Sequence, residues 1–337
     1  MIYPKFLKDK DTIGVPAPSD GANDEAHINR YKYSSNFFGN KNYKLELSKN
    51  INKSTMARSA DKKTRGKELN EMFKSKNIDF ILCASGGEFL VECLPYIDFN
   101  LIKENPKFVA GFSDPTGILF PITTKYNIST IYGNNFSSFG REKLSKSHYD
   151  FLDLIEGKKL SFESYPLYEE ERPKTITGLE PYNLTEKVEW KTLDNKEIKI
   201  EGRIIGGCID IISELIGTKY DGMKEFNERY KNDGIIWYFD NCELSMEEII
   251  RVLWKMNEFD YFKYCKGVIF GRFGVNSSWV GYDIKNCLKD SILNDLNIPI
   301  IYDADISHKA ECLPILNGSI ATVECIKNKG TISFELK

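Results

Sequence analysis

The chain has 337 residues, enough for two domains of ordinary size, and its charges nearly cancel, with 46 Lys and Arg against 49 Asp and Glu. The basic residues are scattered, which argues against a nucleic-acid or membrane-binding surface and favours a small partner molecule. No run approaches the ~20 apolar residues that span a bilayer. The first residues also lack the apolar core of a signal peptide, so we expect a cytoplasmic protein.

The cysteines and histidines limit the chemistry that the chain can perform. The eight cysteines are dispersed, mostly within apolar runs, and show neither C-x-x-C spacing nor a histidine partner. We therefore expect reduced, buried thiols and no metal or other cofactor. The three histidines, His27, His148 and His308, are the only imidazoles available as general bases.

Short apolar strands alternate with helical patterns through the first half of the chain. Strands are predicted within 11–21, 43–47, 78–87 and 107–111, and helices at 24–38, 59–74 and 88–94. This alternation predicts an α/β domain with an open parallel sheet of the flavodoxin or Rossmann type. Ligands of such sheets bind beyond the carboxyl ends of the strands, where Ser-Gly-Gly at 85–87 and Gly-Phe-Ser at 111–113 fall.

The segment 107–117 places a serine at a strand-to-helix turn. An apolar strand stops at Gly111, and the helix is expected to begin with Asp114 as its N-cap and Pro115 as its first helical residue. Ser113 then lies beside free backbone N–H groups at the positive end of the helix, a place that suits a nucleophile. The turn is similar to the elbow of serine hydrolases, although the second glycine of G-x-S-x-G is missing. The alternative is that Ser113 and Asp114 only cap the helix.

The sequence changes character between 161 and 199, where prolines and an acidic run accompany short alternating pieces. We interpret 166–198 as a region that connects an N-terminal α/β domain, 1–165, to a C-terminal domain, 199–337. The second half is expected to contain strands at 199–207, 234–240, 267–271 and 298–305, helices at 209–216, 245–256 and 282–296, and closing strands at 320–325 and 331–336. These patterns predict a mixed α/β domain with a β-rich end.

A serine that reacts at neutral pH needs a base, and usually a carboxylate that orients this base. His308 follows a predicted buried strand and lies in a loop, whereas His27 and His148 lie in polar stretches typical of exposed helix faces. Asp240 ends the predicted strand 234–240 and is the candidate carboxylate. Its alternative role is that of a turn residue or helix cap.

Four segments occur in a fixed order: Ser-Gly-Gly at 85–87, Leu-Pro-Tyr-Ile-Asp at 94–98, Asn-Pro-Lys at 105–107 and Gly-Phe-Ser-Asp at 111–114. Three more follow at 130–136, 202–207 and 303–308. In order and spacing these segments resemble the LD-carboxypeptidase family of serine peptidases, over nearly the whole chain. The later segments are most similar to its microcin-immunity branch.

The resemblance implies a Ser-Glu-His triad, with Ser113 as the nucleophile and His308 as the base. The family's strand ends in Leu-Glu or Ile-Glu where this chain has Phe-Asp, so we take Asp240 as the orienting carboxylate and keep Glu243 as the alternative. Cys208 stands where many members have asparagine, which affects local substrate contacts.

Two further sets of residues are candidates for contact with a substrate. Backbone N–H groups of Gly86 or Gly87 and of Asp114 are expected to hold a tetrahedral oxyanion, because both loops lie at one edge of the sheet. Trp190 is a candidate stacking surface, and the alternative is an aromatic side chain packed in the connecting region.

The resemblance implies hydrolysis of L,D-peptide bonds in cell-wall tetrapeptides or, in the immunity branch, of acyl links to an aminoacyl-nucleotide. It also implies a homodimer. The site is expected in the cleft between the two domains, because Ser113 belongs to one of them and Asp240 and His308 belong to the other. The alternative is a non-catalytic protein of two lobes that binds a small ligand through the same three side chains.

Overall fold

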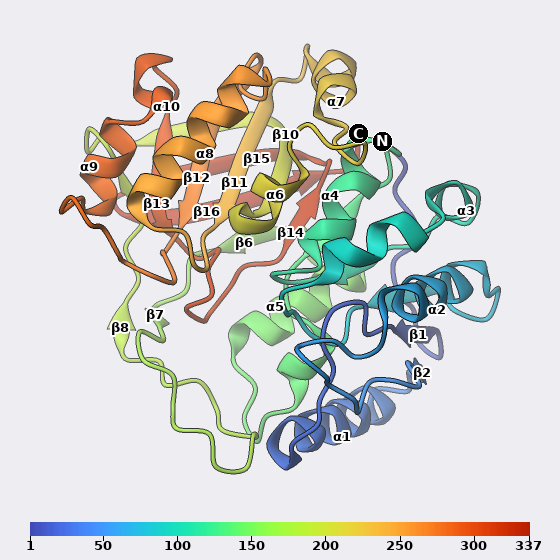
Figure 1. Cartoon of the computed structure of the whole chain (residues 1–337). Helices are drawn as coiled ribbons and strands as arrows, with labels where there is room; N and C mark the ends of the chain where they lie inside the picture. Colours follow the sequence, from blue (N-terminus) through green and yellow to red (C-terminus); the bar gives the residue numbers. More distant parts are fainter.

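The computed structural model describes residues 1–337 and contains two large β-sheets that contribute to one hydrophobic core (Figure 1). The first sheet has the strand order β14-β5-β4-β3-β1-β2. Its strands are β1 (Thr12–Val15), β2 (Lys44–Leu47), β3 (Phe80–Leu82), β4 (Val109–Gly111), β5 (Thr130–Tyr132) and β14 (Ile315–Asn317). All pairs are parallel except β14 with β5. The predicted parallel sheet is confirmed, with strands shorter than the sequence indicates.

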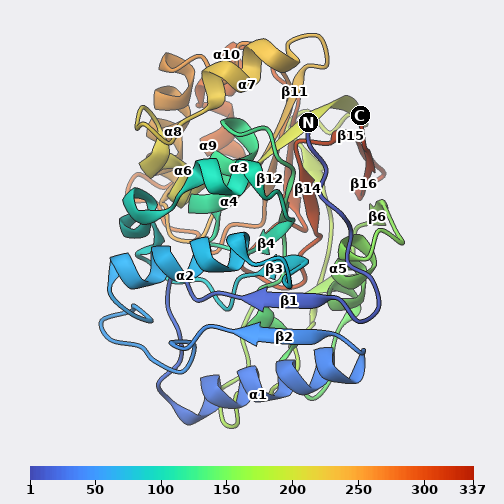
Figure 2. The same cartoon turned by 90° about the vertical axis from the view of Figure 1, so that its right-hand side faces the viewer.

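The helices of the first half connect these strands, and Figure 2 shows α1 next to the edge strand β2. They are α1 (Glu25–Asn40), α2 (Lys62–Lys74), α3 (Phe99–Glu104), α4 (Thr116–Thr124) and α5 (Lys146–Ile155), with 3-10 turns η1 (Leu90–Tyr96) and η2 (Phe136–Phe139). Side chains of Asp24 and Asp61 accept N–H groups of the first turns of α1 and α2. Every residue of α4 is buried, because this helix lies between the two sheets.

The second sheet has the order β6-β16-β15-β10-β11-β12-β13-β9. Its strands are β6 (Ser161–Glu163), β9 (Lys191–Thr192), β10 (Ile198–Cys208), β11 (Ile235–Asp240), β12 (Cys265–Gly271), β13 (Ile300–Ala304), β15 (Ile320–Ile326) and β16 (Lys329–Glu335). The central strands β10 to β13 are parallel, and the last two strands form an antiparallel pair. The expected mixed domain with a β-rich end is therefore confirmed.

Five helices accompany the second sheet: α6 (Ile209–Leu215), α7 (Met223–Tyr230), α8 (Met246–Glu258), α9 (Ile284–Lys289) and α10 (Ile292–Asp295). Ser245 and Glu248 form a capping box at the start of α8. The single helix predicted at 282–296 is wrong, because Ser291 is extended and starts a second helix. The helix predicted at 88–94 is the 3-10 turn η1, which contains Pro95.

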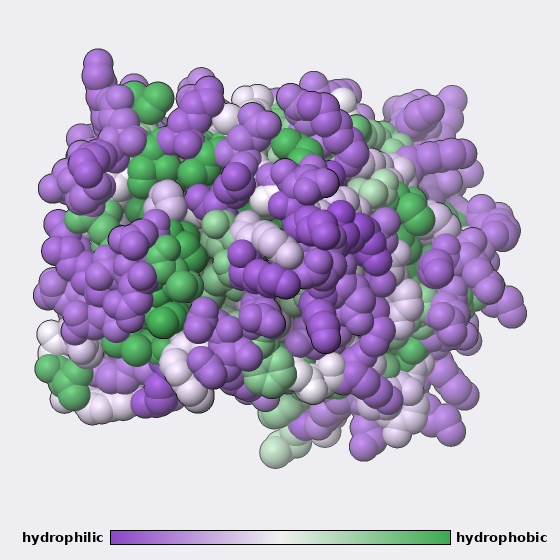
Figure 3. Space-filling view, turned by 90° about the horizontal axis from the view of Figure 1, so that it is seen from above, coloured by the Kyte–Doolittle hydropathy of each residue, from purple (hydrophilic) through white to green (hydrophobic).

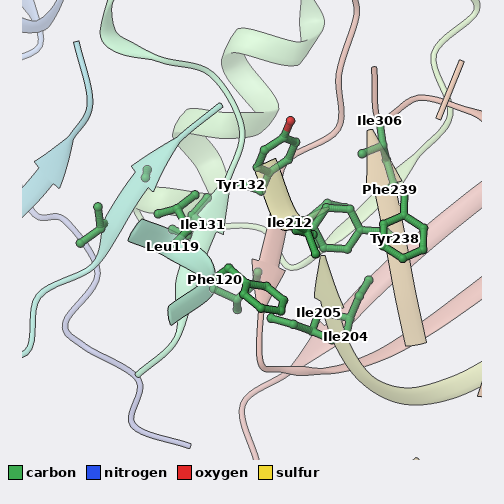
Figure 4. Close-up of a cluster of buried hydrophobic side chains, with 14 of the residues drawn as sticks. Leu119, Phe120, Ile131, Tyr132, Ile204, Ile205, Ile212, Tyr238, Phe239 and Ile306 are labelled. Atoms are coloured by element: carbon green, nitrogen blue, oxygen red, sulfur yellow. The ribbon is translucent and has the colours of Figure 1, made fainter. Parts of the chain in front are cut away.

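Strand exchange and a buried cluster join the two sheets. β6 pairs with β16 of the second sheet, and β14 pairs with β5 of the first. Each sheet thus contains one strand from the other part of the chain. The domain boundaries at 165 and 199 stay a prediction. Figure 4 shows the buried side chains between the sheets, contributed mainly by α4, β5, β10, α6 and β11. They include Leu119, Phe120, Ile131, Tyr132, Ile204, Ile205, Ile212, Tyr238, Phe239 and Ile306.

The connecting region crosses from the second sheet towards α1 (Figure 1). β7 (Leu167–Tyr168) and β8 (Glu186–Lys187) pair with each other, and the segment between them reaches the N-terminal part. There the Nε–H of Arg30 donates to the carbonyl of Gly178 at 2.6 Å. The region is thus held by its own strand pair and, at its middle, by α1.

The outer surface is mostly hydrophilic on the face seen in Figure 3, with separate apolar patches. None of the helices combines the length and the apolar character that crossing a bilayer requires. The eight cysteines are free thiols, and five of them are buried, which agrees with the sequence-based expectation for those five.

Candidate active site

The turn after β4 holds Ser113 in a strained conformation. Its φ of 70° lies in the left-handed region, which costs a residue with a side chain about 1–3 kcal/mol. Such strain is a feature of the strand-to-helix elbows that present a nucleophile. Gly86 approaches this turn closely, since a Cβ on Gly86 would lie 3.2 Å from the Cβ of Ser113. The glycine therefore allows the two loops at the sheet edge to meet.

A chain of hydrogen bonds links Ser113, His308 and Asp240. The Oγ of Ser113 lies 2.9 Å from Nε2 of His308, and Nδ1 of His308 lies 3.0 Å from Oδ1 of Asp240. Because a carboxylate only accepts hydrogen bonds, Nδ1 carries the proton and Nε2 is free to accept the Ser113 hydroxyl. The Asp240 side chain is fully buried, and that of His308 is 10 % exposed. The structure thus brings together three residues from opposite halves of the chain.

The loop that carries His308 is held by a buried ion pair. Arg272, which follows β12, donates from Nη1 to Oδ1 of Asp305 at 2.7 Å. The hydroxyl of Ser307 donates to the carbonyl of Arg272 at 2.6 Å. These bonds attach the segment after β13, which carries His308, to the end of β12. The backbone of His308 is therefore held at the edge of the sheet.

Tyr132, at the end of β5, joins both halves of the site and was not predicted from the sequence. Its hydroxyl donates to Oδ2 of Asp240 at 2.6 Å and accepts the N–H of Ser113 at 3.3 Å. Its ring lies 5.7 Å from the ring of Tyr238 on β11, and Figure 4 shows its hydroxyl oxygen pointing away from the other labelled side chains. The only sequence signal was its place in the segment 130–136, and that segment does not specify its partner.

The alternative acid, Glu243, forms no hydrogen bond with the histidine. The carboxylate of Asp210 accepts the backbone N–H groups of Cys242, Glu243 and Leu244, which fixes the turn after β11. In this turn Glu243 is exposed, and no hydrogen bond or ion pair joins it to His308. Of the two carboxylates considered from the sequence, only Asp240 reaches the imidazole.

The carboxylate of Asp240 favours the charged form of the His308 imidazole. Burial alone disfavours the imidazolium, but the charge of Asp240 and its hydrogen bond outweigh burial and raise the pKa of His308 above its ordinary value of 6.5. The same carboxylate that orients the ring therefore also makes it a stronger base.

The expectation that Asp114 caps α4 is wrong. Pro115 precedes the first residue of α4, and no side chain caps this helix. The buried carboxyl of Asp114 accepts the hydroxyl of Ser19 and, at 3.0 Å, the N–H of Leu90. Burial raises its pKa from 3.8 to about 6, although these hydrogen bonds oppose the shift. Asp114 thus ties the turn that carries Ser113 to Ser19 and to the start of η1.

The backbone donors expected for an oxyanion remain free. The N–H groups of Gly86, Gly87 and Asp114 donate to no acceptor within the protein. Gly87 has a φ of 149°, and a Cβ there would lie 2.4 Å from the Oγ of Ser19, so only glycine fits. Of these residues Gly86 lies nearest to the Ser113 hydroxyl, since a Cβ on it would be 3.5 Å from Oγ.

The structure corrects the sequence-based expectations for two residues, Trp190 and His148. Trp190 is fully buried, donates from Nε1 to Asp305 at 3.0 Å and packs against Gly330, so it offers no stacking surface. The alternative, a packed aromatic side chain, holds. His148 is also fully buried, whereas His27 is exposed and bonded to Asp24. Trp190 is buried against Asp305, which is distant in the chain, whereas His148 forms hydrogen bonds with Ser138 and Ser145 nearby and stacks on Tyr182.

A cavity of about 390 Å³ contains Ser113 and His308. Its lining comes from both halves of the chain and from the connecting region, as expected for a site in the cleft. The other residues that line it are His27, Arg30, Gly86, Phe112, Asn134, Asn135, Ser137, Ser138, Arg141, Glu169, Arg172, Pro173, Thr175, Glu180, Tyr182, Ser307, Ala310 and Cys312. Cys208 is not among them; its N–H donates to Thr116 at the start of α4.

The elbow, the imidazole and the buried carboxylate form the arrangement that serine hydrolases use. Comparison with known proteins assigns the family: the chain belongs to the LD-carboxypeptidases, with the N-terminal domain of that family matching residues 13–133 and its C-terminal domain matching residues 201–323.

Individual relatives support this assignment. The chain is 27 % identical to the microcin C7 self-immunity protein MccF of Escherichia coli, over 88 % of this chain and 86 % of that protein. It is also 27 % identical to the "Probable murein peptide carboxypeptidase" of Bacillus subtilis, over 65 % of this chain and 60 % of that protein.

Solved structures show the same fold. A structure of MccF in complex with aspartyl sulfamoyl adenosine has a TM-score of 0.83 at 22 % identity and covers 100 % of this chain and 99 % of that one. A MccF-like protein from Bacillus anthracis has a TM-score of 0.83 at 25 % identity and covers 100 % of both chains.

Proposed function

We propose that this protein is a serine carboxypeptidase that hydrolyses an amide bond near the C-terminal end of a small substrate. The observation that carries the proposal is the continuous set of hydrogen bonds from Ser113 through His308 to Asp240, in a cavity between the two sheets. A serine in this setting attacks a carbonyl carbon, because the neighbouring imidazole takes its proton.

In the first half of the reaction, Oγ of Ser113 bonds to the substrate carbonyl carbon while its proton moves to Nε2 of His308. Asp240 stabilises the imidazolium, and the N–H groups of Gly86 or Gly87 and of Asp114 hold the oxyanion. The imidazolium then gives its proton to the departing amine as the C–N bond breaks. An ester between Ser113 and the substrate acyl group remains.

Water completes the cycle. His308 takes a proton from a water molecule, whose oxygen attacks the ester carbonyl, and a second tetrahedral intermediate forms. When it collapses, the C–O bond to Ser113 breaks and the imidazolium returns its proton to Oγ. The products are a carboxylic acid and the amine released earlier, and the enzyme is restored.

Two substrate types suit this reaction. One is a cell-wall tetrapeptide with an L,D-peptide bond, in line with the name of the Bacillus subtilis relative. The other is a peptidyl- or aminoacyl-nucleotide, in line with the ligand of the MccF structure. We also propose a homodimer in the cytoplasm, as the family resemblance implies; light scattering of the purified protein checks the dimer.

A fluorophosphonate probe tests the reaction without knowledge of the substrate. We expect the probe to label Ser113, and mass spectrometry to detect cleavage of a cell-wall tetrapeptide or of an aminoacyl sulfamoyl adenosine. Ser113→Ala and His308→Ala should each abolish nearly all turnover and cost little more in combination, because the two residues act as one unit. Ser35→Ala, on α1 outside the cavity, is the matched control.

Absence of labelling and of turnover with both substrates would favour the other class of function, a protein that only binds a small ligand. Additive losses in the double variant would also argue against the triad. The strained φ of Ser113 favours the enzyme, because a side chain that only binds a ligand has no need of an elbow.

A further inference from the structure

Three arginines from three separate segments line the cavity that contains Ser113. Arg30 lies on α1, Arg141 follows η2, and Arg172 belongs to the connecting region. None of them forms an ion pair, whereas the buried arginines elsewhere in the chain pair with carboxylates. Unpaired guanidinium groups gathered in one cavity are unusual, because each repels the others unless an anion lies between them.

Each guanidinium is held in place by a single hydrogen bond to a backbone carbonyl. Arg30 donates from Nε to Gly178 at 2.6 Å, and Arg172 donates from Nη2 to His308 at 3.1 Å. Arg141 donates from Nη1 to the carbonyl of Glu180. Two of the three nitrogens on each arginine therefore have no acceptor in the protein.

Arg141 is the most firmly positioned of the three. Its guanidinium lies over the ring of Tyr182 at 4.0 Å, and the ring of Tyr182 stacks on buried His148. Its Nε is buried and has no hydrogen-bond partner. A fixed guanidinium with free N–H groups can bind an anion without a further loss of side-chain freedom.

The acidic residues of the cavity form no ion pair with these arginines, although Oε2 of Glu180 is buried there without a hydrogen-bond partner. Oε1 of Glu180 accepts the N–H groups of Thr177 and Ile176, and these bonds lower the pKa of its carboxyl to about 2. Oε2 of Glu169 accepts the N–H of Asn183 at 2.7 Å. Burial, together with the charge of Arg141, lowers the pKa of Arg30. The charge of Arg172 lowers this pKa further and that of Glu180 raises it, so the three arginines and Glu180 share one electrostatic environment.

We propose that Arg30, Arg141 and Arg172 form an anion subsite that binds an oxyanion group of the substrate. The proposal rests on the proposed function, because it places this group beside the bond that Ser113 attacks. Arg172 donates to the backbone carbonyl of His308, the residue whose ring contacts the Ser113 hydroxyl, so the subsite adjoins the reacting groups. The fork of a guanidinium matches two oxygens of a carboxylate or of a phosphate.

Two sources share this chemistry: the terminal carboxylate of a peptide and the phosphate of a nucleotide. Binding to the Ser113→Ala variant, measured by calorimetry, separates them without any need for turnover. The first pair of probes is a tetrapeptide ending in D-alanine, as the free acid and as the C-terminal amide. The second pair is adenosine monophosphate and adenosine.

We expect the charged member of at least one pair to bind at least 10-fold more tightly than its uncharged partner. A preference in the first pair alone identifies the carboxylate, one in the second pair alone identifies the phosphate, and both support the shared chemistry. Adding Arg141→Gln or Arg172→Gln should weaken binding of the preferred anion about 10- to 100-fold and remove most of the preference. Arg251→Gln, an exposed arginine on α8, is the matched control and should change nothing.

Equal affinities within both pairs, or no binding of either anion, would overturn the proposal, as would arginine variants that bind like the control. Arg172 is exposed, so its replacement leaves the fold intact, and melting temperatures check this for each variant. If anions bind as expected but the probe does not label Ser113, the anion subsite stands and the hydrolytic function fails. The two proposals are therefore tested separately.

Discussion

Replacing Asp240 by asparagine tests how the site sets the tautomer of His308. The hydroxyl of Tyr132 donates to Oδ2 of Asp240 and at the same time accepts the N–H of Ser113. An asparagine would keep the donation from Tyr132 only if its oxygen takes the place of Oδ2. Its amide nitrogen then faces Nδ1 of His308, 3.0 Å away in the present structure.

An amide nitrogen donates and cannot accept, so it forces Nδ1 to give up its proton. The proton then sits on Nε2, 2.9 Å from the Oγ of Ser113, where a base is required. The ring can no longer take the serine proton. We therefore expect Asp240→Asn to lower turnover by orders of magnitude, up to ~10⁴-fold, the loss found when an amide replaces the carboxylate of a well-studied triad.

The rate of Ser113 labelling by a fluorophosphonate measures this loss whichever substrate is natural, and thermal melting shows that the fold persists. Glu243→Gln is the matched control, because Glu243 is exposed and forms no hydrogen bond with the imidazole. A rate within a few-fold of the unmodified protein for Asp240→Asn, with a lower melting temperature, would refute the reasoning. A slower Glu243→Gln would assign the acid to Glu243.

Three further predictions follow from the geometry. Tyr132→Phe removes a hydrogen-bond donor from buried Asp240 and an acceptor from the N–H of Ser113. We therefore expect a loss of about 1–3 kcal/mol in unfolding free energy and a decrease in kcat rather than a change in KM. An unchanged kcat would leave Tyr132 with a packing role only. Because His308 must be neutral to act as a base and its pKa is raised, kcat/KM should increase with pH through a midpoint above 6.5. In Asp240→Asn the carboxylate no longer opposes burial, so the residual activity should have a lower midpoint than that of the unmodified protein; identical midpoints would contradict this. The pKa of Asp114 is raised to about 6 from 3.8, so the folded protein binds more protons than the unfolded chain in that window and loses stability as pH increases through it. Asp114→Asn lacks this loss. The unfolding free energy of the variant, relative to that of the unmodified protein, should therefore increase by about 1 kcal/mol between pH 5 and pH 8, as denaturant titrations can measure. A difference that is independent of pH would show that the carboxyl is already ionised at pH 5.

Local patterns in the sequence predict the framework of the site. A short apolar strand that stops at a glycine, followed by a helical pattern, is enough to place Ser113 at a turn. Loops after buried strands likewise place His308 and Asp240 at the edge of the second sheet. These inferences succeed because strand and helix periodicity depend on residues a few positions apart.

The partners of these side chains depend on residues far apart in the chain. Whether Asp114 caps a helix or binds Ser19, and whether Asp240 or Glu243 turns inward, depends on how the loops at the two sheet edges meet. The backbone N–H groups that Asp210 binds turn Glu243 outward, and no local pattern contains that contact. Trp190 is buried for the same reason, since its partner Asp305 lies 115 residues away.

The sequence by itself determined two α/β parts, the turn that carries the serine and the family resemblance. Only the tertiary structure decided which groups contact one another: Tyr132 with Asp240, and the three arginines with one cavity. The physical reason is that helix and strand patterns report which face of an element is buried, whereas hydrogen bonds of buried polar groups are fixed when the two sheets pack together.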